Sequence, residues 1–280
     1  MRWDPGHRSD DVIDARGQGG FGGMRLGLGG FLVVGVLSLV FHRNLFALFQ
    51  TDGSAPTSPV ATGPAQSTPS ADRSVQFVSF VLDDVQATWT RTMPAMGRQY
   101  ERARLVLFSQ SVTTGCGGAD SQTGPFYCPA DQRVYLDLDF FRALSTRFGA
   151  PGDFAQAYVI AHEVGHHVQR LLGIDARVRA SSASQERALS VRLELQADCF
   201  AGVWAHSTQQ RNILESGDLE EALGAAASVG DDRIQRSAGR RVNPETWTHG
   251  SAQQRSAWFR RGWTSGDPQQ CNTFGGADPT

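Results

Sequence analysis

The chain has 280 residues, 40% of them hydrophobic, and its formal net charge at pH 7 is −2. It is long enough for one large domain or two small ones with a buried core, and the near-neutral charge argues against nucleic acid as a partner. Four cysteines are too few for a disulfide-dense scaffold, but their even number permits two bridges in an oxidising compartment.

Residues 1–24 are polar and glycine-rich, and we predict that they form a short, flexible cytoplasmic tail. No charged residue occurs at positions 26–41, and the apolar sequence resumes at residues 45–49 after Arg43. Because Arg43 can extend its charged end to the membrane interface, the run reaches the ~20 residues that a bilayer crossing needs. We therefore predict one transmembrane anchor at residues 25–49. A cleaved signal peptide is the alternative, although no A-x-A site follows the run.

The charges before the apolar run indicate its orientation. Arg16 and Arg25 favour a cytoplasmic N-terminus, and hence a single-pass protein of the cytoplasmic membrane whose domain lies outside the cytoplasm. Asp10, Asp11 and Asp14 weaken this charge signal.

The folded domain is predicted at residues 73–280, after a Pro-, Ser- and Thr-rich linker at residues 50–72. Apolar residues at helical spacing predict a helix at residues 75–89, and residues 104–112 and 133–141 are predicted to be strands. The remaining pattern is largely helical, and a small sheet followed by helices indicates an α+β domain. We expect the strand at residues 133–141 to be an edge strand that holds an extended substrate by main-chain hydrogen bonds.

An H-E-x-x-H motif, formed by His162, Glu163 and His166, lies in a predicted helix that Asp153 caps and Gly173 ends. Positions i and i+4 share a helix face with Cβ atoms ~5–6 Å apart, so the two imidazoles can bind one Zn²⁺. Glu163 flanks the metal without binding it and can take a proton from a zinc-activated water before passing it to the leaving amine. The alternative is a chance motif on a solvated helix face. Apolar neighbours argue against it, because burying these three side chains without a role is costly.

Two more residues of this stretch need an explanation. Gly165 costs ~1 kcal/mol of helix propensity relative to alanine, which indicates that another backbone segment or a ligand approaches closely. His167 is rotated by ~100° from His166 about the helix axis, so we predict packing or a surface hydrogen bond for it.

A catalytic zinc needs a third protein ligand and one open position. The extended motif H-E-x-x-H-x-x-G-x-x-H fails here, because Gln169 and Leu172 occupy its glycine and third-histidine positions. We predict Glu194 as the third ligand. Asp198, one turn later on the same helix face, is predicted to accept the outer N–H of a ligating histidine. The reverse assignment of the two carboxylates stays open, as does a pair of solvated helix acids.

His249 precedes a predicted helix that Ser251 and Gln254 cap in a capping box. It could donate a hydrogen bond to the oxyanion of a tetrahedral intermediate, with an ordinary structural contact as the alternative. His249 and His206 are also lesser candidates for the third metal ligand. Arg255 could pair with either carboxylate or only stabilise the fold.

The four cysteines allow three pairings. Cys116 and Cys128 flank a glycine-rich loop that they could close, which would leave Cys199 and Cys271 to form a second bridge. Four free thiols would fit a cytoplasmic domain, whereas two bridges are favoured outside the cytoplasm.

Nearly the whole chain resembles a family of membrane-anchored bacterial proteins described as "putative neutral zinc metallopeptidases". The resemblance implies zinc, a zincin-like fold and a single membrane anchor. Residues 194–198, E-x-x-A-D, are also similar to an element of the gluzincin peptidases, and His249 is similar in placement to a histidine of that group. The strings that carry the family resemblance are "MRW", "SDDVIDARG", "GPFYCPAD", "GDFAQAYVIAHEVGHHVQ", "LSVRLELQADCFAGVWAHS", "GDLEEAL", "GDDRIQ", "THGSAQQRSAWFRRGW" and "GDPQQCNTF".

The sequence thus predicts a membrane-anchored zinc metallopeptidase with a zincin-like α+β domain, one Zn²⁺ per chain and a protein or peptide substrate. Nothing indicates a nucleic-acid partner, and the sequence does not set the oligomeric state. Two other functions stay open: a non-catalytic, zinc-containing binding or scaffold protein of the envelope, and a zinc hydrolase of a non-peptide amide.

Overall fold

The computed structural model describes residues 1–17 and 69–275. The predicted transmembrane anchor at residues 25–49 and most of the predicted linker at residues 50–72 lie outside these ranges, so both stay predictions. Within the two ranges, no helix combines the length and the apolar character that a membrane crossing requires.

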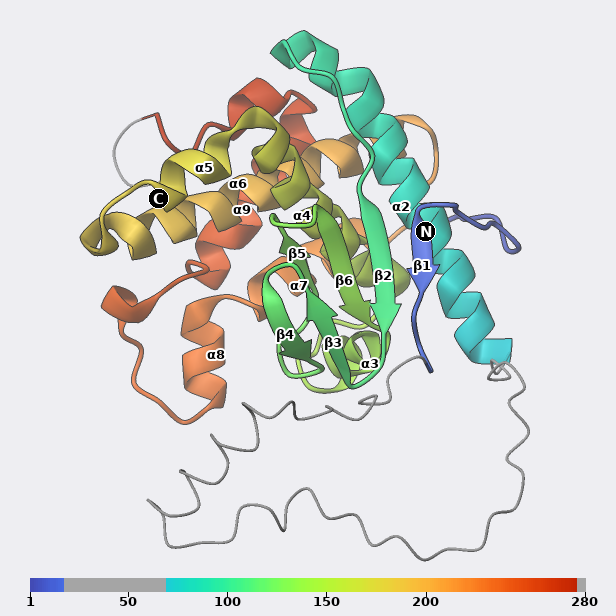
Figure 1. Ribbon diagram of the computed structural model, residues 1–280, viewed down its shortest axis with the longest axis horizontal. Coiled ribbons are helices and arrows are strands. Elements are labelled where there is room, and N and C mark those ends of the chain that lie inside the picture. The colour runs from blue at the N-terminus through green and yellow to red at the C-terminus, as the bar shows by residue number, and fades with distance from the viewer. Residues whose placement is uncertain (18–68, 276–280) are drawn as a thin grey trace, which may run out of the picture. The chain divides into compact units, whose positions relative to one another are not determined.

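A mixed four-stranded sheet has the strand order β1-β2-β6-β5 (Figure 1). β1, β2 and β6 run parallel, whereas β5 is antiparallel to β6. β3 and β4 form a separate antiparallel hairpin. The strands are β1 (Val12–Asp14), β2 (Arg104–Phe108), β3 (Ser111–Thr114), β4 (Gly117–Asp120), β5 (Phe126–Cys128) and β6 (Arg133–Asp137).

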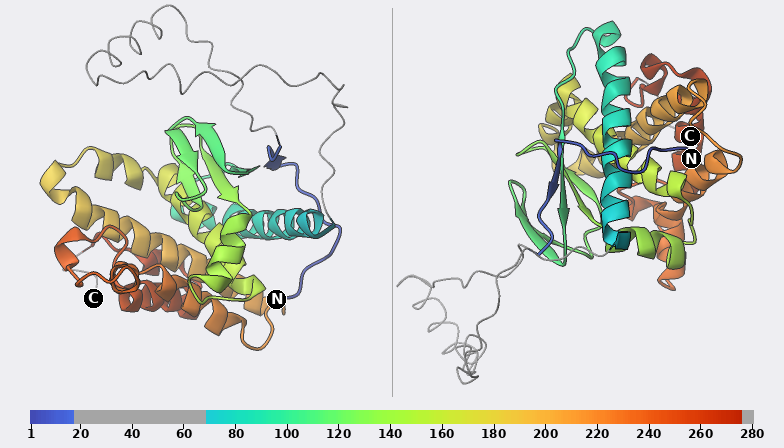
Figure 2. Two further views of the ribbon diagram at one scale, coloured as in Figure 1. Left: turned by 90° about the horizontal axis from the view of Figure 1, so that it is seen from below. Right: turned by 90° about the vertical axis from the view of Figure 1, so that its right-hand side faces the viewer.

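The helices lie on one side of the four-stranded sheet (Figure 2), and α4 contacts both β5 and β6. They are α2 (Pro69–Thr92), α3 (Asp139–Thr146), α4 (Asp153–Leu172), α5 (Ile174–Arg179), α6 (Ala183–Gln210), α7 (Asp218–Ser228), α8 (Asp231–Ser237) and α9 (Ala252–Ser265), with short 3₁₀ turns at Met93–Met96, Pro244–Thr246 and Pro268–Cys271.

The main core joins α2, α4 and α6. Phe154 of α4 stacks on Trp204 of α6 with ring centroids 5.3 Å apart, and Trp89 of α2 meets Phe200 of α6 edge to face at 5.1 Å. All four side chains are fully buried. Buried aromatic pairs contribute ~0.5–1.5 kcal/mol beyond the area they bury. The helices that carry the H-E-x-x-H and E-x-x-A-D motifs are therefore held by a rigid interior.

The α+β class is confirmed, but one strand assignment is wrong. The stretch predicted as an edge strand, residues 133–141, is β6 only as far as Asp137, and β6 lies between β2 and β5. The edge strand next to β6 is β5, in the glycine-rich loop region. Strand order depends on which segments pair, and the hydrophobic pattern of a single strand does not report it.

The predicted flexible tail at residues 1–24 is also wrong for its described part. Val12–Asp14 forms β1, in register with β2 from Leu105 to Leu107, and the Met1 side chain belongs to the main core with 6% of its surface exposed. Residues 1–16 belong to the same compact unit as the C-terminal range. The segment is polar because its contacts with α2 and β2 are largely hydrogen bonds and ion pairs.

Helices α6 and α9 cross without space for side chains. A Cβ atom at Gly202 would overlap the carbonyl of Phe259, and one at Gly262 would overlap the carbonyl of Cys199. These two glycines set the closeness of the crossing, and α9 carries Arg255 to the buried face of α6.

We expect Gly262→Ala to lower the free energy of unfolding by at least ~1–3 kcal/mol, because the added methyl group must separate α6 from α9. Gly224 in α7 is the matched control, since a Cβ there meets no atom within 4 Å. Gly224→Ala should raise stability by up to ~1 kcal/mol through helix propensity. Chemical denaturation of both variants measures the two effects, and an unchanged stability of Gly262→Ala would contradict the close crossing.

Candidate metal centre

The two histidines of α4 and the glutamate of α6 converge on one point. Their potential ligand atoms all lie within 4.8 Å of one another. Nε2 of His162 is 3.2 Å from one carboxylate oxygen of Glu194, and Nε2 of His166 is 3.4 Å from the other. Two imidazoles and one carboxylate are a donor set typical of catalytic zinc, so these residues fit the ion that the motif predicts.

Asp198 lies behind His162, on the side away from this cluster. Its Oδ1 is 2.9 Å from Nδ1 of His162 and accepts a hydrogen bond of 2.5 Å from the Tyr158 hydroxyl. A carboxylate on Nδ1 leaves the lone pair of Nε2 directed at the cluster. This geometry matches the predicted supporting role of Asp198 and does not favour the reverse assignment.

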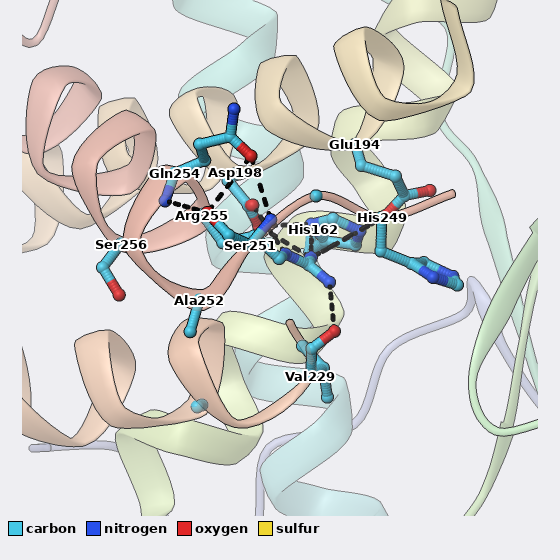
Figure 3. A network of polar contacts seen from close by, with 12 residues as sticks. His162, Glu194, Asp198, Val229, His249, Ser251, Ala252, Gln254, Arg255 and Ser256 are labelled. Carbon is cyan, nitrogen blue, oxygen red and sulfur yellow. Dashed lines mark hydrogen bonds and ion pairs between the residues drawn. The ribbon is translucent and has the colours of Figure 1, made fainter. Parts of the chain in front are cut away.

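Arg255 reaches from α9 to the same carboxylate (Figure 3). Its Nε and Nη2 donate to the two oxygens of Asp198 at 2.8 and 2.9 Å, and Nη2 is 3.7 Å from Glu194. Both side chains of the pair are buried, at 3% and 0% exposure. Burial alone would raise the pKa of Asp198, but the Arg255 and His162 charges hold it below its usual value. The sequence left open which carboxylate Arg255 meets.

The second histidine has its own support, which sequence reasoning missed. Nδ1 of His166 is 2.9 Å from the side-chain oxygen of Gln169, and the amide nitrogen of Gln169 donates to the carbonyl of Leu193 and to Gln196. Gln169 thereby links the His166 ring to α6, next to Glu194. Its position three residues after a predicted ligand, on the same helix face, was the available signal.

Gly165 has the close contact that its place in the motif predicts. A Cβ there would lie 3.1 Å from both Cα and O of Ala197. Because α4 and α6 approach to backbone contact here, Glu194 can reach the two histidines of the other helix.

Glu163 lines a cleft of about 1000 Å³, together with His162, His166 and Glu194. Glu163 is buried, with 7% of its surface exposed. The edge strand β5 contributes Phe126 and Tyr127 to the lining of the same cleft. The cleft therefore places a carboxylate that is not in the metal cluster beside the three potential ligands.

His249 also lines this cleft, and a residue that sequence reasoning missed holds it in place. Nδ1 of His249 is 3.1 Å from Oδ1 of Asp231, the first residue of α8. The other oxygen of Asp231 accepts the backbone N–H groups of Thr248, His249 and Gly250 at 2.7–3.1 Å. The hydrogen bond that His249 donates to Asp231 and the nearby charge of Glu194 raise the pKa of His249, whereas burial and the charge of Arg255 lower it. Asp231 lies in the string "GDDRIQ", but the sequence did not show its role, because its partner His249 lies 18 residues further on, in a loop.

Two other histidines lie outside the cluster. His167 is buried, with Nε2 2.7 Å from the carbonyl of Glu101 and Nδ1 3.0 Å from the Tyr127 hydroxyl, which confirms the packing role predicted for it. His206 bonds through Nδ1 to the carbonyl of Trp263 at 2.7 Å and is not a ligand candidate.

The predicted disulfide pairing is confirmed. Cys116 is bonded to Cys128, and Cys199 is bonded to Cys271. The second bridge follows directly after Asp198 and joins α6 to the C-terminal turn. Gln196, which contacts Gln169, also donates to the carbonyl of Cys271 at 2.9 Å.

Comparisons with known proteins agree with the motifs. A family model described as "Putative neutral zinc metallopeptidase" matches residues 1–274. The protein "Uncharacterized protein YpfJ" of Escherichia coli (strain K12) is 47% identical over 287 residues, which cover 98% of this chain and 99% of that protein. "Uncharacterized protein Rv2575" of Mycobacterium tuberculosis (strain ATCC 25618 / H37Rv) is 49% identical over 207 residues, 70% of this chain and 69% of that protein. No solved structure matches. The chain belongs to the neutral zinc metallopeptidase family that this model describes.

Proposed function

We propose that the chain is a zinc-dependent peptidase in which His162, His166 and Glu194 hold one Zn²⁺ and Glu163 is the general base. The observation that carries the proposal is the convergence of three ligand atoms within 4.8 Å, in the wall of a cleft that Glu163 also lines. A metal site that served only for stability would not need an open cleft or a carboxylate beside the ligands.

Zinc, when bound, polarises the scissile carbonyl and lowers the pKa of water towards ~7. Glu163 takes the proton from the attacking water and delivers it to the leaving nitrogen, which is the task of a carboxylate next to a ligand but outside the metal cluster. Asp198 and Gln169 hold the Nδ1 sides of His162 and His166, so that both Nε2 atoms face the metal position.

The edge strand in the lining of the cleft supports a peptide as the substrate. β5 is the edge strand of the four-stranded sheet next to β6, and its residues Phe126 and Tyr127 line the cleft. An edge strand can bind an extended chain through main-chain hydrogen bonds, which recognise a peptide of any sequence. The mixed sheet, which packs against α4, also supports the zincin-like fold that the family resemblance implies.

Zinc content and zinc dependence test this function directly. We expect about one zinc per purified chain, and cleavage of unfolded proteins that stops on chelation and returns when zinc is added. The same screen should include cell-wall amide fragments. Stoichiometric zinc without any cleavage would support a scaffold protein, and cleavage of wall amides alone would support a non-peptide hydrolase.

We also propose that protonated His249 donates through Nε2 to the oxyanion that develops on the scissile carbonyl, while Asp231 fixes its ring. Removal of one oxyanion donor typically lowers kcat by ~10²–10³. We therefore expect His249→Ala to lower kcat by about this factor with little change in KM or zinc content. A change in KM alone would indicate a binding role instead.

The pH dependence of kcat tests whether Asp231 keeps His249 protonated or only packs against it. Asp231 raises the pKa of His249, with Glu194 acting in the same direction and Arg255 against it. Activity that needs the protonated ring should fall as the pH rises through this pKa. Asp231→Asn removes the negative charge that raises the pKa of His249. The decrease in kcat at alkaline pH should therefore begin at a lower pH. A decrease that begins at the same pH would exclude His249 as the titrating donor.

A further inference from the structure

Residues 1–16 contact the domain along their whole length. The backbone N–H of Arg2 donates to the carbonyl of Ile213 at 2.8 Å, and the Met1 amino group donates to Asp153, the first residue of α4, at 2.7 Å. Further along, β1 adds a parallel strand to β2 over three residue pairs. The segment thus contacts both the sheet and the beginning of the helix that carries H-E-x-x-H.

Side chains reinforce this placement in the middle of the segment. His7 is 2.8 Å from Asp83 of α2, and Arg102 bridges Asp83 and Asp11. Gln86, which is fully buried, donates to the same Asp11 carboxylate at 3.1 Å. Without residues 1–16, the buried amide of Gln86 would lose its hydrogen bond to Asp11, and three residues of β2 would lose their pairing with β1. Unpaired buried polar groups lower the free energy of unfolding.

The contacts of residues 1–16 with the domain are incompatible with a single membrane crossing between the two. A single crossing between residues 17 and 69 would put β1 and β2 on opposite sides of a bilayer whose apolar core is ~30 Å thick. Exchange of β1 between two copies does not avoid the conflict, because every copy would have its β1 on the wrong side.

We infer that residues 1–16 and the metal domain lie in the same compartment. This excludes the single-pass orientation that the charges before the apolar run favour, with the N-terminus inside and the domain outside. Two crossings would need ~40 apolar residues, and residues 26–49 are too few for this.

The disulfides indicate that this shared compartment is outside the cytoplasm. Structural bridges persist outside the cytoplasm, and both bridges of this chain lie in the domain that contains β1. Residues 1–16 carry three arginines against four aspartates, so the segment has little net charge to hold it on the cytoplasmic side.

Cysteine labelling of the full-length protein in cells tests the inference. Asp10 and Thr264 are exposed, one in the N-terminal segment and one in α9. Asp10→Cys and Thr264→Cys would each be treated with a membrane-impermeant maleimide before and after permeabilisation, with the parent protein as the background control. We expect the two positions to behave alike. Labelling of both in intact spheroplasts assigns the segment and the domain to the outside, and protection of both assigns them to the cytoplasm. Labelling of one and protection of the other would overturn the inference.

A cross-link provides a second measurement that does not depend on the membrane. Arg8 and Asp72 form an ion pair at 2.5 Å, and both are accessible. Arg8→Cys and Asp72→Cys, joined in cells by a short bis-maleimide, should hold the N-terminal fragment on the domain after cleavage at a protease site inserted near residue 60. Separation of the fragments on a denaturing gel, with full labelling of both cysteines, would contradict the same-side arrangement.

Discussion

Glu163→Gln is expected to abolish most of the peptidase activity while the protein keeps its zinc. Glutamine has nearly the same shape as glutamate but cannot take a proton from water at neutral pH. General-base catalysis typically contributes ~10²–10⁴-fold to a rate, so kcat should fall by at least two orders of magnitude. Metal analysis of the same preparation should still give one zinc per chain, because the proposed ligands His162, His166 and Glu194 are unchanged.

The comparison needs a control with the same chemical change elsewhere. Glu220, which is exposed in α7, is suitable, and Glu220→Gln should leave kcat, KM and zinc content unaltered. If Glu163→Gln kept full activity, Glu163 would not be the base. If it lost its zinc, Glu163 would have to be placed among the ligands. If cleavage products in cell envelopes were the same with wild-type and Glu163→Gln protein, the enzyme function itself would fail.

The parts of the site that sequence reasoning found share one property, which is helical spacing. His162 and His166 lie four positions apart, as do Glu194 and Asp198, and a regular helix brings each pair onto one face. The sequence could not show how the two helices meet, but Gly165 indicated a close approach, and its neighbour is the backbone of Ala197. Local geometry therefore predicted most of the cluster.

The parts that sequence reasoning missed depend on long-range pairing. Asp231 contacts His249 across a loop, and the residues of β1 pair with residues of β2 that lie 93 positions further along the chain. The N-terminal segment was predicted to be flexible because a polar, glycine-rich composition is usual for disordered tails. Its aspartates and arginines instead meet charged partners on α2 and near β2, and composition does not distinguish a solvated charge from a paired one.

The largest structural effect is expected from Asp198→Ala. The substitution leaves the Arg255 guanidinium buried without its main partner, and breaking a buried ion pair in this way typically costs ~3–5 kcal/mol. It also frees Nδ1 of His162, and loss of such a contact behind a metal ligand usually lowers metal affinity 10–100-fold. Unfolding should be measured in the presence of chelator, because bound zinc stabilises the folded state by itself. Zinc affinity should be measured separately by competition.

A double variant separates the two roles of Asp198. In Asp198→Leu combined with Arg255→Met, two apolar side chains replace the buried pair, and such replacements are often neutral or stabilising. We expect the zinc-free stability to return to within ~1–2 kcal/mol of wild type, whereas the zinc affinity should stay low because His162 still lacks its carboxylate. Recovery of zinc affinity together with stability would show that Asp198 acts only through the fold. If neither the stability nor the zinc affinity recovered, the ion pair between Asp198 and Arg255 would stabilise the fold more than two apolar side chains can. The expected split, with stability restored and affinity lost, would assign Asp198 to the orientation of a metal ligand.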